Sequence, residues 1–181
     1  MQTKFINLFA GAGAGKSTTA AGLFCKMKLQ GILAELVTEF AKERVWAEES
    51  QALVCQPYIS GVQFYRQWLV NGKVLFAITD SPLLLGVVYG GFGVTSDYRE
   101  ALVQQFNLFD NLNVYIERSE THPYEPQGRL GTAEDAENID LSVKQFLDYT
   151  EIPYHTIKMS GDGSHIQEIY DLCLTSTNST N

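Results

Sequence analysis

The chain has 181 residues with 13 basic and 21 acidic side chains, so its formal net charge at pH 7 is −8. This length suits one domain with a proper core, and 45% hydrophobic and 19% charged residues is the balance of an ordinary globular protein. Proteins that hold nucleic acid along its phosphates need a basic face, and this sequence has no run rich in Lys and Arg. Extended contact with nucleic acid is therefore not expected, although a local site for one nucleotide is compatible with the composition.

Cysteine usage and apolar runs bear on the compartment. Cys25, Cys55 and Cys173 are odd in number and lack C-x-x-C spacing, so we expect reduced core thiols rather than disulfides or a zinc site. No apolar run reaches the ~18 residues of a membrane span. The apolar N-terminal stretch 5–10 is also shorter than the ~7–15 residues of a secretory signal core. We therefore expect a cytoplasmic protein, which for a viral protein means the host cytoplasm.

The N-terminal part of the chain predicts two strands and two helical regions. KFINLFA at 4–10 is short, apolar and ended by glycines, as in a buried strand. The apolar residues between 17 and 30 mark one face of a helix. ILAELVT at 32–38 predicts a second strand, and a helical region over 39–70 follows, with a break near Pro57.

The remaining sequence continues this alternation. VLFAITD at 74–80 is an almost unbroken apolar run, which suits a strand covered on both faces. A Gly-rich, mobile stretch over 86–97, a helix over 97–110 and a strand over 112–118 come next. A polar loop over 119–132 leads to a helix that runs to about 150 and has a capping-type start at Thr132 and Asp135. The last elements are a strand over 154–159 and a helix over 163–174. This order predicts a doubly wound parallel sheet in one domain, residues 1–175, with a polar tail at 176–181.

The segment from Ala10 to Ser17 reads AGAGAGKS, which matches the phosphate-binding pattern G-x-x-x-x-G-K-[ST] except that Ala10 replaces the first glycine. Glycines allow bends that point N–H groups at phosphate oxygens, and the following helix adds the positive end of its dipole. Lys16 can reach the β- and γ-phosphates, and the Ser17 hydroxyl can bind Mg²⁺. A tight Gly/Ala turn without a ligand is the alternative, but the predicted strand and helix on either side favour an ATP or GTP site. The expected nucleotide-binding residues are Gly11, Ala12, Gly13, Ala14, Gly15, Lys16, Ser17, Thr18 and Arg118.

Kinases, switch GTPases and ring ATPases all use such a loop. The chain lacks the N-K-x-D sequence with which GTPases read guanine, and it has no room for the helical lid domain of a ring ATPase. A kinase needs only the core, an acceptor pocket and a basic lid. The sequence therefore predicts an α/β fold of the three-layer P-loop NTPase type, nucleotide kinase-like, with a five-stranded parallel sheet and with ATP and Mg²⁺ as cofactors.

Two acidic residues follow predicted strands, where open α/β sheets place their ligands. Asp80 closes VLFAITD and can hold Mg²⁺ or its water, although Asp-Ser-Pro is also typical of a helix N-cap. Glu39 follows the second strand and can take the proton of an acceptor hydroxyl. A surface glutamate attracted by a helix dipole is the alternative for Glu39. With Lys16, both acids are expected to be catalytic.

Arginines can neutralise charge on the transferred phosphoryl group. The segment 118–132 carries two prolines, two glycines and two arginines, which is the composition of a closing lid. Arg129 inside this segment is expected to be a catalytic phosphate contact, and Arg118 at its start is expected to bind the nucleotide.

The region 46–68 is unusually rich in aromatic residues and could hold a nucleobase acceptor. Helical spacing indicates that many of these rings belong to the core instead. Gln63 and Arg66 are the polar pair in this region that we select for testing as acceptor contacts.

Four segments together resemble the small P-loop kinase/ATPase proteins of tailed bacteriophages, near the nicotinamide riboside kinase and deoxynucleoside kinase branch. They are GAGAGKSTTAAGLF, LVTEFAK, ITDSPLLL and PYEPQGR with the following TAEDA, and the likeness covers roughly residues 3–155. It implies that Glu39 is the acid after strand two, Asp80 the acid after strand three and Arg129 the lid arginine. Phe40 stands where deoxynucleoside kinases have proline after this glutamate.

Three functions are compatible with these observations. The first is transfer of the ATP γ-phosphate to a small nucleoside- or nucleotide-type acceptor. By the phage resemblance, the second is the same reaction on 5-hydroxymethyluracil in phage DNA, a step in thymidine hypermodification, against which the acidic charge counts. The third is a nucleotide-gated interaction module without chemistry. No membrane partner is expected, and a homodimer is compatible with the sequence.

Overall fold

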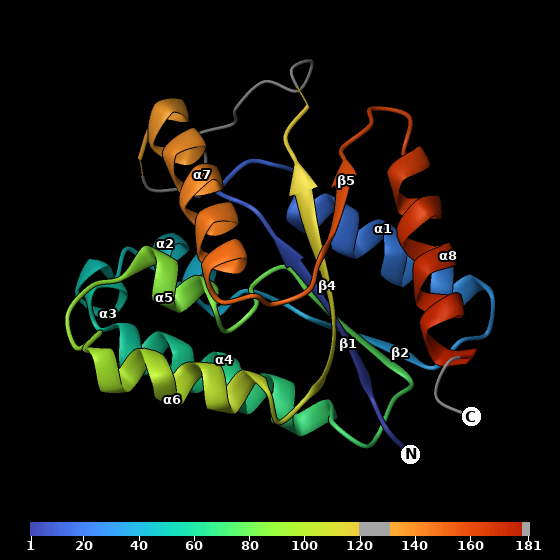
Figure 1. Ribbon diagram of the computed structural model, residues 1–181, viewed down its shortest axis with the longest axis horizontal. Coiled ribbons are helices and arrows are strands. Elements are labelled where there is room, and N and C mark those ends of the chain that lie inside the picture. Colours follow the sequence, from blue (N-terminus) through green and yellow to red (C-terminus); the bar gives the residue numbers. More distant parts are fainter. Residues whose placement is uncertain (120–130, 179–181) are drawn as a thin grey trace.

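The computed structural model describes residues 1–119 and 131–178 and shows a parallel sheet between two layers of helices (Figure 1). All neighbouring strands pair in parallel, in the order β2-β3-β1-β4-β5. The strands are β1 Lys4–Phe9, β2 Ala34–Val37, β3 Phe76–Thr79, β4 Asp110–Glu117 and β5 His155–Lys158. The expected five-stranded parallel sheet of a three-layer α/β fold is confirmed.

The helices cover the sheet from both faces, as the alternating sequence pattern predicts. Helices α1 and α8 lie on one face, and α4, α6 and α7 lie on the other. The helices within the described residues are α1 Lys16–Leu29, α2 Phe40–Trp46, α3 Ser50–Val54, α4 Gln56–Val70, α5 Leu85–Tyr89, α6 Ser96–Phe106, α7 Ala133–Tyr149 and α8 Ser164–Asn178. None of them is both long and apolar enough to cross a membrane.

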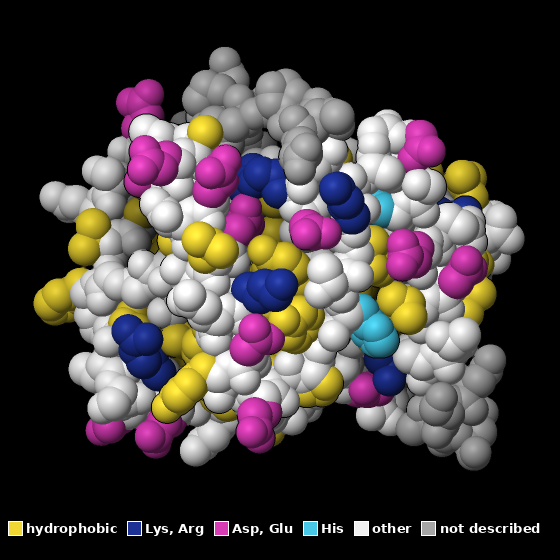
Figure 2. All heavy atoms as spheres, turned by 45° about the horizontal axis from the view of Figure 1, so that its top comes forward, with side chains coloured by type: hydrophobic (Ala, Val, Ile, Leu, Met, Phe, Trp, Pro, Cys, Tyr) yellow, Lys and Arg dark blue, Asp and Glu magenta, His cyan; other side chains and the backbone are white. Residues whose placement is uncertain are grey.

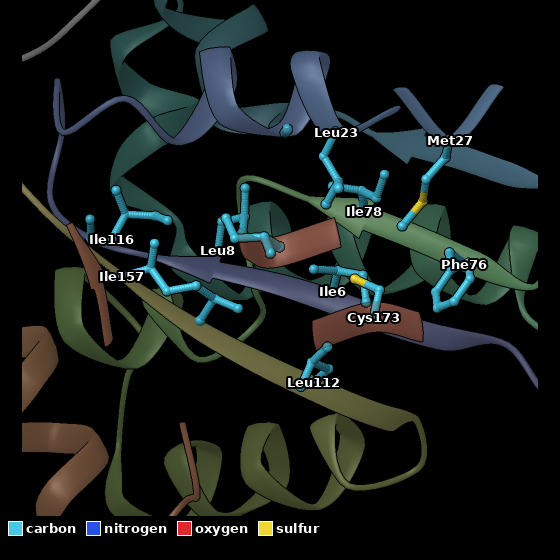
Figure 3. Packing of buried hydrophobic residues seen from close by; sticks show 14 of the residues in the cluster. Ile6, Leu8, Leu23, Met27, Phe76, Ile78, Leu112, Ile116, Ile157 and Cys173 are labelled. Carbon is cyan, nitrogen blue, oxygen red and sulfur yellow. The ribbon is translucent and has the colours of Figure 1, made fainter. Parts of the chain in front are cut away.

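The alternation of side chains along β1 explains why both faces are covered. Ile6 and Leu8 point to the face under α1, where they meet Leu23 (Figure 3). Phe5 and Phe9 point to the opposite face and pack in the second core cluster. All five side chains are almost fully buried. Burial of a side chain of this size contributes about 1.5–3 kcal/mol, so the central strand is anchored by both helical layers.

The helical region after β2 is divided more finely than the sequence pattern predicts. It forms three helices, α2, α3 and α4, and Pro57 lies in the first turn of α4. Proline is tolerated there because the first-turn N–H groups have no partner within the helix. The expected interruption near Pro57 is therefore confirmed as the start of a helix.

Several other expectations need correction. The Gly-rich stretch 86–97, which was expected to be mobile, carries most of α5 and the first residues of α6 at its two ends. The last helix extends to Asn178, beyond its expected end at 174. Cys173 is a core thiol whose pKa burial raises to about 12, but Cys25 is exposed.

The expected capping start of α7 is confirmed, since Thr132 and Asp135 form a capping box.

Candidate functional site

The predicted phosphate loop connects β1 to α1 at the carboxyl end of the central strand. Gly13 and Gly15 have φ values of 75° and 94°, a region that disfavours other residues. A Cβ atom on Gly15 would also lie 2.5 Å from the Met159 sulfur. The backbone bends that these two glycines were expected to permit are therefore present.

Gly11 is needed for a different reason than predicted. It is not among the glycines with positive φ, so a bend is not what requires it. A Cβ atom on Gly11 would lie 2.4 Å from the Ala136 carbonyl oxygen in α7. Real Cβ contacts are not that close, so glycine at this position allows α7 to pack directly against the phosphate loop.

Lys16 lies at the start of α1 and is buried against the loop. Its Nζ donates hydrogen bonds to the carbonyl oxygens of Ala10 at 2.9 Å and Gly11 at 2.7 Å. Burial lowers the pKa of Lys16, and the negative charges of Glu39, Asp80 and Asp140 act in the opposite direction. The loop therefore holds a cation whose neighbours are acids from three different elements.

A cleft of about 580 Å³ opens beside the loop. Ala12, Gly13, Gly15, Lys16, Ser17 and Thr18 line one side. The other side is mostly apolar and comes from α2 to α5 and α7, with Ala41, Val45, Leu53, Ile59, Leu85 and Ile139 as its apolar residues. Gln56 and Tyr89 add an amide and a phenol, and Glu39 and Lys42 add charges. Most of the predicted loop residues thus face the same space as Glu39, while Gly11 and Ala14 are buried behind it.

Asp80 follows the last residue of β3 and is only 6% exposed. Its Oδ1 atom is buried and has no hydrogen-bond partner within residues 1–119 and 131–178. The alternative interpretation as a helix N-cap is wrong, because α5 begins at Leu85 and its N-cap is Leu84. Burying a carboxylate oxygen without a hydrogen-bond partner costs folding free energy. The Oδ1 atom of Asp80 therefore suits a position where a ligand binds.

Glu39 is the N-cap residue of α2 and lines the cleft, but its side chain makes no capping hydrogen bond. The residues on both sides of it are fixed by Gln63. The Gln63 side chain accepts a hydrogen bond from the Phe40 N–H at 3.1 Å and donates to the Thr38 carbonyl at 3.4 Å. The backbone that carries Glu39 is therefore tied to α4.

Gln63 and Arg66, the pair selected for testing as acceptor contacts, have other partners in the structure. Neither residue lines the cleft. Arg66 donates to the Thr38 carbonyl at 3.3 Å and forms a 2.8 Å ion pair with Glu43. Both side chains hold the connection between β2 and α2, and this use could not be read from their positions in an aromatic-rich segment.

The aromatic residues of region 46–68 do not line the cleft either. Trp46, Tyr65 and Trp68 are more than half exposed, while Phe64 packs against Phe109 in the core. The aromatic ring that does line the cleft is Tyr89 from α5. The acceptor side of the cleft is therefore built mainly from aliphatic residues.

Arg118 lies where the sequence places it, just after β4 and beside the phosphate loop. Its Nη2 donates to the Ala12 carbonyl at 2.8 Å, and its Nε donates to the Asp140 carboxylate at 2.8 Å. Asp140 was not predicted as a site residue. A signal for it exists, since the buried positions Ala136, Asp140, Val143 and Leu147 of α7 share one face, and an aspartate on an otherwise apolar face is unusual.

The remaining expectations concern the lid arginine and the residues that bind Mg²⁺. Arg129 lies outside the described residues, so its role as a lid arginine stays a prediction. Within the described ranges, no group of three or more His, Cys, Asp or Glu side chains could hold a metal ion by itself. Protein groups that could contribute to a metal site beside the loop are the Ser17 hydroxyl, which lines the cleft, and Asp80.

Comparison with solved structures supports the fold assignment. Two structures of deoxyadenosine kinase from M. mycoides resemble the chain. The one with the products dCMP and dCDP bound is 17% identical, with a TM-score of 0.58 over 97% of this chain and 99% of the other. The one with dATP bound is 19% identical, with a TM-score of 0.59 over 93% of this chain and 98% of the other. Shikimate kinase from Acinetobacter baumannii in complex with shikimate is 19% identical, with a TM-score of 0.56 over 97% of this chain and 95% of the other. No protein-family model and no curated protein sequence matches the chain. The likeness therefore lies in the fold.

Proposed function

We propose that the protein is a kinase that transfers the γ-phosphate of ATP to a hydroxyl of an uncharged, nucleoside-type compound. The observation that carries this proposal is the shared cleft, in which the phosphate loop faces Glu39 and an apolar lobe. Both groups of structural neighbours are kinases of small molecules, which agrees with this reading. A cleft of about 580 Å³ is within the range of small-molecule sites.

The loop residues would bind the triphosphate. Backbone N–H groups of the second half of the loop and the first turn of α1 supply hydrogen bonds and the positive end of the helix dipole. Lys16 would exchange its two carbonyl partners for phosphate oxygens. Mg²⁺, when bound, neutralises phosphate charge, and the residues that would hold it are Ser17 and Asp80. The unpartnered Oδ1 atom of Asp80 fits such a role.

Glu39 would serve the acceptor. The acceptor oxygen attacks the γ-phosphorus, the bond between this phosphorus and the oxygen of ADP breaks, and the hydroxyl proton passes to the Glu39 carboxylate. Since phosphoryl transfer depends mostly on positioning and charge neutralisation, fixing the backbone of Thr38 and Phe40 through Gln63 serves this step. Arg129 is proposed to neutralise charge on the transferred group from the lid.

The charges of the acceptor side favour an uncharged acceptor. Among the described residues that line the cleft, the cations are Lys16, at the phosphate loop, and Lys42. Anionic acceptors such as a nucleoside monophosphate or a carboxylate need more cationic partners than Lys42 alone. The aliphatic lining with one buried amide, Gln56, instead suits a flat, neutral base.

A base within DNA is the competing acceptor. Figure 2 shows the face at the carboxyl ends of the strands, where basic side chains are scattered among acidic and apolar ones rather than joined into a continuous patch. Together with the net charge of −8, this arrangement counts against extended contact with a DNA strand.

Transfer of labelled γ-phosphate tests the proposal directly. Wild-type protein would be incubated with ATP, Mg²⁺ and either free nucleosides, nucleoside monophosphates or DNA that contains 5-hydroxymethyluracil. We expect label on a free nucleoside. If only the DNA is labelled, the acceptor is a base in DNA and the proposed acceptor is wrong. If ATP binds but none of the three compounds is labelled, the non-enzymatic module is favoured.

A further inference from the structure

Asp140 connects three parts of the site although it does not line the cleft. One carboxylate oxygen accepts a hydrogen bond from the Gly11 N–H, and the other accepts from Arg118 Nε at 2.8 Å. The Asp140 side chain is 12% exposed and that of Arg118 is 20% exposed, so the ion pair is shielded from water. The carboxylate therefore ties α7 both to the phosphate loop and to the end of β4.

Side chains bind the carbonyl oxygens in the first half of the loop. Lys16 binds the carbonyl oxygens of Ala10 and Gly11, and Arg118 binds the carbonyl oxygen of Ala12. Three successive carbonyl groups, whose negative ends would repel phosphate, are thus occupied by cations. Asp140 accepts from the Gly11 N–H and from Arg118, so the position of the Gly11 peptide and the contact of Arg118 with Ala12 depend on its carboxylate.

The packing of α7 supports a specific role for this contact. Gly11 has no side chain, which lets the Ala136 and Asp140 turn of α7 approach the loop backbone. Tyr115 from β4 donates a hydrogen bond to the Asp140 main-chain carbonyl at 3.3 Å. The helix turn is therefore anchored independently of the carboxylate, and removing the carboxylate charge need not move the helix.

We propose that Asp140 is a positioning residue for triphosphate binding, which acts through Gly11 and Arg118 rather than on the substrate. It keeps the loop in the conformation that receives phosphate before the nucleotide arrives. The inference rests on the proposed function only in assigning the loop to a triphosphate, and it is independent of the acceptor.

The test uses Asp140→Asn, which keeps the size of the side chain but directs an amide at Arg118. Affinity would be measured by calorimetry with magnesium tripolyphosphate, a probe of the loop without a base, and with ATP. We expect at least a roughly tenfold loss for both ligands, because a hydrogen bond to a charged group is removed. The Michaelis constant for ATP should rise accordingly, while kcat changes about threefold or less, since the residue does not touch the reacting atoms.

Tyr115→Phe is the matched control, because it removes a hydrogen bond to the same residue without touching the loop. It should bind tripolyphosphate as wild type does. An equal loss in Tyr115→Phe, or unchanged affinity in folded Asp140→Asn, would overturn the inference. If Asp140→Asn does not fold, Arg118→Lys replaces it: a lysine cannot span Asp140 and Ala12, so wild-type affinity in this variant would also overturn it.

A double variant separates positioning from direct contact. If Asp140 acts through Arg118, Asp140→Asn combined with Arg118→Lys should bind tripolyphosphate no worse than the weaker single variant. Losses that multiply would show that the two side chains act separately and would overturn the coupling. If wild-type protein binds neither tripolyphosphate nor ATP, it is the proposed function that fails.

Discussion

The two halves of the cleft are built in different ways. The proposed phosphate side comes from one short segment of the chain, between Ala12 and Thr18. It is proposed to bind phosphate mainly through backbone groups. The acceptor side takes residues from α2, α3, α4, α5 and α7 and uses side chains. A contiguous backbone site tolerates few changes and can be recognised locally, whereas a side-chain site can be altered residue by residue. We therefore expect changes on the phosphate side to abolish the reaction and changes on the acceptor side to alter selectivity.

Lys16→Ala should have the largest effect. The phosphate side would lose its buried cation, and we expect phosphotransfer to fall by about 10³-fold or more, since charge stabilisation of this kind is worth about 10²–10³-fold for a single donor. The measurement is γ-phosphate transfer under saturating ATP. Lys28→Ala, an exposed lysine later in α1, is the control and should behave as wild type. Near-normal turnover in Lys16→Ala would remove the kinase assignment.

Asp80→Asn should come next, with a loss of about 10²–10³-fold in kcat. The amide keeps the shape but is a poor partner for Mg²⁺, so the loss should be partly restored by raising the Mg²⁺ concentration. Because Oδ1 is buried without a partner, removing the charge should not lower the melting temperature of the ligand-free protein. A variant with full activity and no Mg²⁺ response would show that Asp80 has no part in the reaction.

Glu39→Gln should lower kcat by about 10²-fold, the lower end for loss of a general base, and leave the Michaelis constant for ATP nearly unchanged. Arg129→Ala should also lower kcat, and the double variant should lose less than the product of both effects, since both are proposed to act on one transition state. Glu100→Gln, at an exposed glutamate of α6 that does not line the cleft, is the matched control. If Glu39→Gln keeps the wild-type kcat, the acceptor must be activated by another group.

Gln56→Leu should have the smallest effect and the most selective one. Gln56 donates to the Ser60 hydroxyl at 3.3 Å, and both side chains pack where a Cβ atom on Gly86 would lie. We expect about a tenfold rise in the Michaelis constant for the acceptor and none for ATP, because Gln56 would lose its hydrogen bond to the acceptor while the phosphate loop is unchanged. Gln67→Leu, in the same helix but away from the cleft, should leave the acceptor constant unchanged. An equal rise for ATP would show that the two halves are not separable.

Local sequence was sufficient to locate the loop that lines one side of the cleft. The spacing of Gly13, Gly15, Lys16 and Ser17 follows from what a polyphosphate needs from a strand, a turn and a helix start, all within one short segment. Glu39 and Asp80 could be predicted because they follow strands of a parallel sheet, and such strand ends meet at one edge.

Local sequence misled where the partner of a residue lies far along the chain. Gln63 and Arg66 carry suitable groups for a nucleobase, but the folding of α4 against β2 directs them to the backbone at Thr38. No local pattern distinguishes Gln56 or Tyr89, which line the cleft, from the other polar and aromatic residues of the chain. Which side chains line the acceptor lobe depends on how five helices are oriented, and periodicity does not determine that orientation.

The sequence by itself determined the alternation of strands and helices, the parallel sheet and the phosphate loop, because these depend on contacts between residues close in the chain or on the apolar faces that they share. Only the tertiary structure decided why Gly11 is glycine and which groups Asp140 contacts. These two residues are 129 positions apart and meet through one hydrogen bond and the close approach of α7. No local pattern encodes such a contact, because it forms only when both helical layers are packed on the sheet.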